Sequence, residues 1–278
     1  MVKLTRQQVE NHIELQGSTL MLRGVDLSGL DLSNLNLAGS DLRKAKLYRT
    51  NLAGSDLREA QMEGASAVEA NFSQANLAGA RLKGITLKGA VLRGAWLIGV
   101  DLHDANLGRA IFVEADLSST VDHDGGTYLG WTDLTEVFAA GANFSRAKLH
   151  GTQLSGSNFR KATFRSADLT QANFSSLADG RRTNLRQADF RSANLTHATL
   201  CGVNLQEANL HQADLTEANL QVLAKWRTDV SGANLEGAIL QGANLKQVQY
   251  TPQTRWDADF VPAIAGAVKK LFSIPNPF

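Results

Sequence analysis

Residues 22–57 read LRGVDLSGLDLSNLNLAGSDLRKAKLYRTNLAGSDL, with a leucine at every fifth position from Leu22 to Leu57. The step of five continues to Leu117, and only Met62 and Ala67 depart from Leu or Phe at these centres. A period of five matches neither the 3.6-residue turn of an α-helix nor the two-residue repeat of a strand. The pattern therefore predicts one elongated domain in which short segments stack as a solenoid.

The positions next to each centre are also restricted. An alanine usually lies two residues before the centre, as at Ala105 and Ala167, so large and small inward side chains alternate and a narrow interior can be filled without overpacking. Asp or Asn usually lies one residue before the centre, where a short polar side chain can bond nearby backbone at a corner; we expect this at Asp26, Asp31, Asn51, Asp56, Asn76, Asp101, Asn106 and Asp116.

The repeat changes register after Leu117 and again after Phe174. These breaks divide the chain into an N-terminal helical cap (1–19), a first repeat region (20–117), an insertion loop (118–141), a second repeat region (142–250) and a C-terminal cap (251–278). The second repeat region is interrupted at 175–183 and 221–229.

The units Ala105-Asn106-Leu107, Ala167-Asp168-Leu169 and Ala213-Asp214-Leu215 resemble the A(D/N)LXX signature of the pentapeptide-repeat proteins. The resemblance covers roughly residues 20–250. It implies an all-β solenoid, a right-handed quadrilateral β-helix with four pentapeptides in each square coil. Successive coils would then lie about 4.8 Å apart.

The two ends differ from the repeats, as the ends of a solenoid must if the core is to be covered. Thr5 and Gln8 match a capping box, and Val9 and Ile13 lie one turn apart, which predicts a short helix over the first coil. The C-terminal tail contains aromatic residues and a stretch from Val261 to Phe272 that we interpret as a second helical cap. The alternatives for this tail are a homodimerisation element and a helix lying on a membrane surface.

Composition excludes several classes of function. The chain has 28 basic and 27 acidic residues, so no global field attracts nucleic acid or an anionic membrane. Its single cysteine, Cys201, cannot form an internal disulfide, and no apolar leader is present, so we expect a cytoplasmic, bacterial protein with no membrane association. The six histidines form no catalytic or metal-binding motif, and adjacent Asp122, His123 and Asp124 have poor spacing for one ion. We predict no enzyme activity, no metal and no cofactor.

One candidate binding surface is apolar. In a square solenoid, residues twenty apart are neighbours, so outward-facing Val91 and Ile111 should be adjacent, with Trp96 and Ile98 on the next face. This candidate apolar set consists of Val91, Trp96, Ile98, Ile111, Val113 and Trp131. Either the aromatic residues of the insertion loop fold back over this set, or a partner protein binds to it.

A second candidate surface is basic. Nine Lys and Arg residues lie between Arg146 and Arg191, against three acidic residues. The set that we consider for binding consists of Arg160, Arg165, Arg181, Arg182, Arg186 and Arg191. It is either a solvated face or a docking site for an acidic protein or a phosphate backbone; stacking aromatics are not interleaved with it, which makes nucleic acid the weaker option.

These features favour a non-enzymatic scaffold that binds another intracellular protein through its outer faces and loops. The resemblance also suggests an alternative, a DNA-mimic regulator of DNA gyrase similar to the quinolone-resistance members. A duplex mimic should display an acidic surface, whereas this chain is neutral overall with a basic segment.

Overall fold

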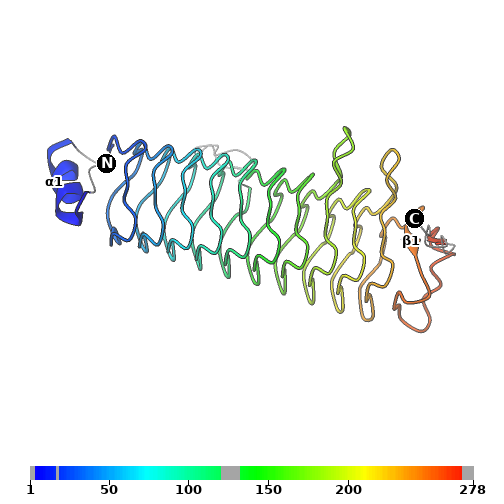
Figure 1. Cartoon of the computed structure of the whole chain (residues 1–278). Helices are drawn as coiled ribbons and strands as arrows, with labels where there is room; N and C mark the ends of the chain where they lie inside the picture. Colours follow the sequence, from blue (N-terminus) through cyan, green and yellow to red (C-terminus); the bar gives the residue numbers. More distant parts are fainter. Residues whose placement is uncertain (1–3, 17–18, 120–131, 271–278) are drawn as a thin grey trace, which may run out of the picture.

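The protein is a rod of stacked coils in a computed structural model that describes residues 4–16, 19–119 and 132–270 (Figure 1). Parallel bridges join residues twenty apart, for example Asp31 to Asn51 and Asn51 to Asn71. Twenty residues are four pentapeptides, so each coil has the four sides that the resemblance to pentapeptide-repeat proteins implies. Most contacts between coils are single-residue bridges. Within the described ranges, regular strand is confined to β1 (Gln249–Tyr250) and β2 (Val268–Lys269).

Each corner repeats one backbone conformation. The residue two positions after a centre has a positive φ angle, as at Asn34 (58°) and Gly39 (68°). Its N–H points along the rod to the next coil, where Asn34 N donates to Ala53 O at 2.9 Å and Gly39 N to Arg58 O at 2.8 Å. Glycine adopts this left-handed conformation without steric cost, which explains why glycines recur with the pentapeptide.

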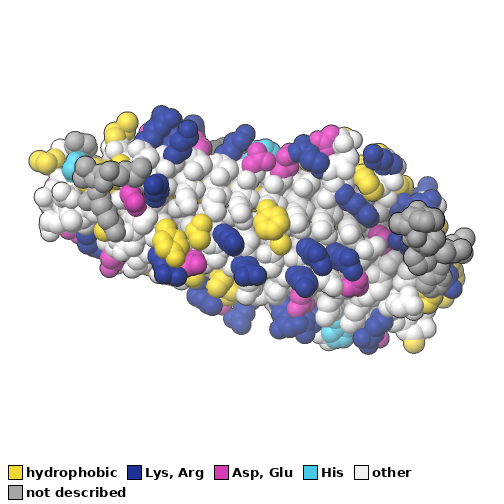
Figure 2. Space-filling view, in the orientation of Figure 1, with side chains coloured by type: hydrophobic (Ala, Val, Ile, Leu, Met, Phe, Trp, Pro, Cys, Tyr) yellow, Lys and Arg dark blue, Asp and Glu magenta, His cyan; other side chains and the backbone are white. Residues whose placement is uncertain are grey.

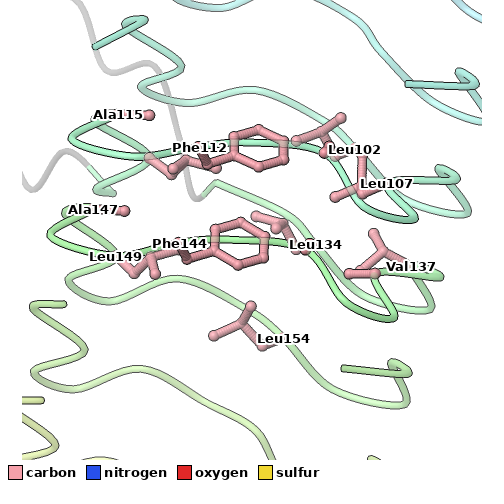
Figure 3. Close-up of a cluster of buried hydrophobic side chains, with 14 of the residues drawn as sticks. Leu102, Leu107, Phe112, Ala115, Leu134, Val137, Phe144, Ala147, Leu149 and Leu154 are labelled. Carbon is pink, nitrogen blue, oxygen red and sulfur yellow. The ribbon is translucent and has the colours of Figure 1, made fainter. Parts of the chain in front are cut away.

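The interior is filled by the centres and the small residues before them. Leu107, Phe112 and Ala110 are no more than 1% exposed. Phenylalanines in consecutive coils stack on one another, with ring centroids 4.8 Å apart for Phe112 and Phe144 and 5.1 Å apart for Phe144 and Phe164 (Figure 3). The alternation of large and small inward residues predicted from the sequence is confirmed.

The polar residue before each centre bonds the corner that follows. Asp26 Oδ1 accepts from Ser28 N at 3.0 Å, and the equivalent bond forms at the other seven predicted positions, Asp31, Asn51, Asp56, Asn76, Asp101, Asn106 and Asp116. These bonds satisfy a corner N–H that points away from the coil-to-coil ladder.

Helix α1 (Arg6–Gln16) covers the first coil. Thr5 N donates to Gln8 Oε1 at 2.8 Å and Gln8 N donates to Thr5 Oγ1 at 3.3 Å, which is the reciprocal capping box expected from the sequence. Val9 is fully buried and Ile13 packs against the core.

The prediction that 118–141 is one insertion is wrong at its C-terminal end. Asp133 bridges Asp101 and Phe138 bridges Asn106, and Leu134 and Ala139 are buried centres. The bridged residues are 32 apart rather than 20, so the insertion amounts to twelve residues and the coil is already re-established at Thr132. Ala139 in place of a leucine centre conceals this register in the sequence.

A threonine closes each break in register. Thr183 Oγ1 accepts from Gly156 N at 2.8 Å and donates to Ser175 O at 3.1 Å. Gly156 and Ser175 are nineteen residues apart, the separation at which corner N–H and carbonyl groups bond directly in a regular coil, so the hydroxyl group bridges the two. Thr132 bonds Gly99 N and Ser118 O in the same way. Thr228 and Thr254 also accept from a corner glycine, Gly202 and Gly232, but donate to Leu200 O and Val230 O instead. We call these four residues the closing threonines, because each gives a corner glycine N–H a hydroxyl acceptor at a break in register.

The predicted helix in the C-terminal cap is wrong within the described residues, where α1 is the only helix. Residues 257–267 form turns, and β2 then pairs in parallel with β1. The last coil offers unpaired backbone, and Val268 N donates to Val248 O at 2.8 Å. Pairing with this edge extends the solenoid, whereas a helix would leave its backbone groups exposed.

Replacing Leu107 by Ala should lower the free energy of unfolding by about 2–5 kcal/mol, because the backbone ladder prevents the interior from closing around the cavity. Arg109→Ala, at an exposed corner, is the control and should change stability by less than about 0.5 kcal/mol. Chemical denaturation of both variants measures the difference. A loss below about 0.5 kcal/mol for Leu107→Ala would contradict the inward assignment.

Thr183→Val keeps the volume of the side chain but leaves Gly156 N–H and Ser175 C=O without their bridging hydroxyl. We expect a loss of about 1–3 kcal/mol in the free energy of unfolding. Thr163→Val, on an outward position, is the matched control. Equal unfolding midpoints for the two variants would show that the closing threonine is dispensable.

Candidate interaction surfaces

The outward positions before the centres form straight rows along the faces of the rod. In the Trp96 row, bridges connect Asn36, Asp56, Asn76, Trp96, Asp116, Lys148, Asp168, Asn194, Asp214 and Ile239. In the Phe138 row they connect Asp26, Lys46, Ser66, Thr86, Asn106, Phe138, Asn158, Asn184, Asn204, Asp229 and Gln249. Both rows are mostly polar, so an apolar member stands out.

The predicted apolar set is only partly brought together. Val91 and Ile111 are bridged neighbours, as expected, and both are half-buried, as are Ile98 and Val113. Trp96 lies on the adjacent face and is 59% exposed. Trp131, with the aromatic residues predicted to cover the set, lies outside the described residues. The structure therefore supplies one strongly exposed aromatic side chain rather than a continuous apolar patch.

The predicted basic set is divided among separate places. Arg165 and Arg191 both bind Asp189, at 2.8 and 2.6 Å. Arg186 binds Glu207 at 2.6 Å on another edge. These ion pairs compensate the positive charge that the sequence counts as a patch. Among the described residues, Arg160 has no carboxylate oxygen within 4 Å.

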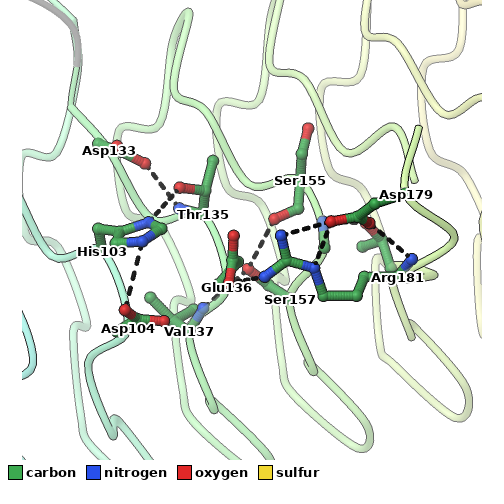
Figure 4. A network of polar contacts seen from close by, with 12 residues as sticks. His103, Asp104, Asp133, Thr135, Glu136, Val137, Ser155, Ser157, Asp179 and Arg181 are labelled. Carbon is green, nitrogen blue, oxygen red and sulfur yellow. Dashed lines mark hydrogen bonds and ion pairs between the residues drawn. The ribbon is translucent and has the colours of Figure 1, made fainter. Parts of the chain in front are cut away.

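Arg181 and Arg182 have structural roles. Arg181 pairs with Asp179 in its own loop and with Glu136, a residue two coils away (Figure 4). Arg182 donates to Gly202 O and Val203 O, both at 2.9 Å, and to Arg227 O at 2.7 Å. Burial lowers the pKa of Arg182, although nearby Asp229 opposes that effect. Both arginines thus hold loops against the rod.

The loops at 175–183 and 221–228 leave the same edge of the rod (Figure 1). Each packs over a corner glycine: a Cβ at Gly156 would lie 2.6 Å from Leu177 Cδ1, and one at Gly202 would lie 3.1 Å from Trp226 Cβ. The guanidinium of Arg182 lies 5.4 Å from the Trp226 ring, which joins the two loops. Cys201 lies between them, 4% exposed, and burial raises the pKa of its thiol, so it is not a reactive thiolate.

One group of side chains has the composition of a metal site. Ligand atoms of His103, Asp104 and Glu136 lie within 4.8 Å of one another. His103 Nδ1 is 2.8 Å from Thr135 Oγ1, and Arg181 already neutralises Glu136 (Figure 4). A guanidinium in this position supplies the positive charge that a cation would otherwise bring, so the group is explained as an ion-pair network.

Phe138 is an exposed residue that the sequence analysis missed. It is 49% exposed and is the only apolar residue between Asp26 and Gln249 in its row, which β2 continues with Val268. It was missed because the sequence analysis extended the first insertion to residue 141. An insertion of twelve residues places Phe138 at an outward position instead. On the face shown in Figure 2, basic side chains surround hydrophobic ones near the middle of the rod.

Comparison with known proteins identifies the family that has this architecture. The family model for pentapeptide repeats matches residues 22–58, 55–94, 87–121, 126–160, 140–175, 182–221 and 226–249. The chain belongs to the pentapeptide repeat family. Members of this family form a right-handed quadrilateral β-helix and are generally non-enzymatic structural or regulatory scaffolds.

Several solved pentapeptide repeat proteins are similar to this chain, but their TM-scores are low. HetL, involved in heterocyst differentiation regulation in the cyanobacterium Nostoc sp. strain PCC 7120, is 29% identical over 89% of this chain and 97% of its own, with a TM-score of 0.29. QnrB1, a plasmid-mediated fluoroquinolone resistance protein, is 17% identical over 86% of this chain and 92% of its own, with a TM-score of 0.38. Rfr23 from the cyanobacterium Cyanothece 51142 is 26% identical over 58% and 91%, with a TM-score of 0.26.

No protein with a curated description matches this chain. Among the described residues, no helix has the length and apolar character needed to cross a bilayer.

The buried carboxylate of Asp229 should make the stability of the protein depend on pH. It is 2% exposed and accepts from Gln206 at 2.7 Å and Lys270 at 3.1 Å. Burial alone would raise its pKa, but hydrogen bonds from Ser231, Gln206 and Lys270 outweigh burial and lower it. Because the folded pKa is depressed, this stabilisation is present above the ordinary pKa and is lost as the pH falls through the folded value.

Asp229→Asn should therefore lower the free energy of unfolding at pH 7 by about 1–3 kcal/mol. The difference from the wild type should shrink as the pH falls below about 4, which urea denaturation at a series of pH values measures. Asp214→Asn, at a half-buried outward position, is the control. A difference that does not change with pH would contradict the assignment.

Proposed function

We propose that this pentapeptide repeat protein is a non-enzymatic, right-handed quadrilateral β-helix that binds another protein through its outer faces and loops. The observation that carries the proposal is Trp96, whose side chain is 59% exposed in a row of polar residues. Large aromatic side chains are the residues that most often anchor protein interfaces, because they bury much apolar area at low entropic cost.

The interior supports a scaffold rather than an enzyme. Leu, Phe and Ala side chains fill it at near-zero exposure, and the hollows found among the described residues lie on the outer surface. A filled tube provides no water-excluding site in which to orient a substrate. A rigid outer surface with fixed spacing between side chains suits recognition of a partner instead.

The gyrase-directed DNA mimic remains a second candidate that charge disfavours. A duplex mimic must present closely spaced negative charge, but this chain has a net charge of +1, and several corners on the face in Figure 2 are basic.

A homodimer through the C-terminal segment is supported only by exposed Val261 and Ile264, at 52% and 85%. The proposed location of the protein is the cytoplasm.

Trp96→Asn should abolish capture of the partner from a lysate of the native host. Asn is the residue at the bridged position 76, so this variant preserves the coil and should match the wild type in thermal unfolding. The measurement is affinity capture followed by mass spectrometry, with the wild type and the variant as baits.

Ile239→Asn is the matched control, because Ile239 is 51% exposed in the same row. It should retain the proteins that Trp96→Asn loses. Gyrase subunits among those proteins would promote the DNA-mimic candidate. Identical captured proteins for Trp96→Asn and the wild type would refute the role of Trp96.

A further inference from the structure

A groove follows one edge of the rod beside Phe138. One hollow of about 350 Å³ is lined by Lys88, Asn106, Gly108, Arg109, Phe138 and Ala140. A second, of about 300 Å³, is lined by Arg109, Ala140, Gly141, Arg160 and Lys161. The two share Arg109 and Ala140, so they form one continuous depression, which we call the edge groove.

The groove exists because two consecutive corners, those after Leu107 and Ala139, carry small residues at three of their four positions. Gly108, Ala140 and Gly141 provide its floor, and longer residues flank them. A Cβ atom added at Gly108 would lie 3.2 Å from Phe138 Cε1, so the phenyl ring rests on the glycine. The ring is thereby fixed beside the groove with 49% of Phe138 exposed.

Four cations surround this floor: Lys88, Arg109, Arg160 and Lys161. Within the described parts of the chain, none has a carboxylate oxygen within 4 Å. The same edge carries Arg49 and Arg186 further along, and these are neutralised by Glu69 and Glu207, at 2.7 and 2.6 Å. These cations therefore lack a direct ion pair where the surface is hollowed and the exposed aromatic ring lies, although Arg160 is close enough to Glu207 to help lower its pKa.

We infer that the edge groove binds an extended acidic segment of a partner protein, with carboxylates on Lys88, Arg109, Arg160 and Lys161 and one apolar side chain on Phe138. This inference rests on the proposed protein-binding function and names the chemistry of the partner. Arginine binds carboxylates with two parallel hydrogen bonds, and the apolar contact supplies the anchor.

The dimensions fix the length of the segment. Lys88 and Lys161 are three coils apart along the edge, which corresponds to roughly 14 Å. An extended peptide advances about 3.3 Å per residue, so four or five residues span the groove. An acidic segment with a central apolar residue would place its carboxylates on the cations at the two ends of the groove and its apolar side chain on Phe138.

A single-stranded nucleic acid fits less well. Binding without sequence preference uses several aromatic rings in series, on which successive bases stack. Phe138 is the only aromatic residue among the described positions of its row, and the chain as a whole is nearly neutral. Nucleic acid is therefore the competing outcome of the test rather than the inference.

The test is calorimetric titration of the full chain with the blocked heptapeptide EDELEDE. The wild type should bind it with a Kd below about 1 mM, and affinity should fall as salt is raised. Phe138→Asn, which restores the residue type of neighbouring positions 106 and 158, should weaken EDELEDE about tenfold but leave EDEGEDE unchanged. The double variant Arg109→Gln with Arg160→Gln should weaken both peptides.

The matched control is Arg146→Gln with Arg165→Gln, which removes the same charge from the neighbouring edge and should bind like the wild type. Thermal unfolding of every variant confirms that it is folded. Failure of the wild type to bind EDELEDE, or equal losses for the two double variants, would overturn the inference. Tighter binding of an eight-nucleotide thymidine oligomer than of EDELEDE would overturn it in favour of nucleic acid.

Affinity capture from lysate separates this inference from the proposed function. A partner that the wild type and Phe138→Asn retain equally, and that Trp96→Asn loses, would refute the edge groove and leave the scaffold function standing. A wild-type bait that captures no protein would refute the scaffold function itself.

Discussion

The hydrogen bond from each corner to the coil beneath it is the constraint on which the rest of the structure depends. Corner donors such as Asn34 N and Gly39 N each point to a carbonyl nineteen residues ahead, which fixes the register at twenty residues per coil. The positive φ angle that aims these groups costs most residues free energy, and the buried centres offset it through hydrophobic contact. Backbone ladder and core are therefore mutually dependent: losing a centre loosens the coil that holds its neighbours.

This constraint also explains how the rod accepts insertions. At the breaks of twelve and six residues, the hydroxyl of a closing threonine takes the place of the backbone carbonyl that the preceding coil requires. At the break of five residues, Gly202 N donates both to Thr228 Oγ1 at 2.9 Å and to Gln221 O at 3.3 Å. The inserted residues then face no register requirement of their own. They remain free to form loops, such as the pair joined through Arg182 and Trp226, without disturbing the core. The loops can therefore vary in sequence and length without changing the stability of the rod.

The fold was predictable from the sequence because its signal is local and repeated. A leucine every fifth residue, with Ala and Asp or Asn at fixed offsets, predicted a stacked solenoid, and the resemblance to pentapeptide-repeat proteins implied its square coil. Thr5 and Gln8 marked α1. The C-terminal helix was mispredicted because spacing of apolar residues does not reveal that an open backbone edge lies nearby; β2 pairs with β1 instead. The end of the first insertion was misplaced because Ala139 occupies a centre normally held by Leu or Phe.

The surface was less predictable, and the reason is geometric. Charges adjacent in sequence can lie on different edges, so four of the six arginines counted as one patch form ion pairs with Asp189, Glu207, Glu136 and Asp179. Arg182 instead donates to backbone carbonyls, and Arg160 lies on the edge groove. Conversely, Lys88, Arg109 and Arg160 are distant in sequence and share one edge through the twenty-residue register and its twelve-residue shift. In a solenoid, a binding surface is therefore a property of rows rather than segments. Phe138 acquires its significance only when its row is aligned, because the other members from Asp26 to Gln249 are polar.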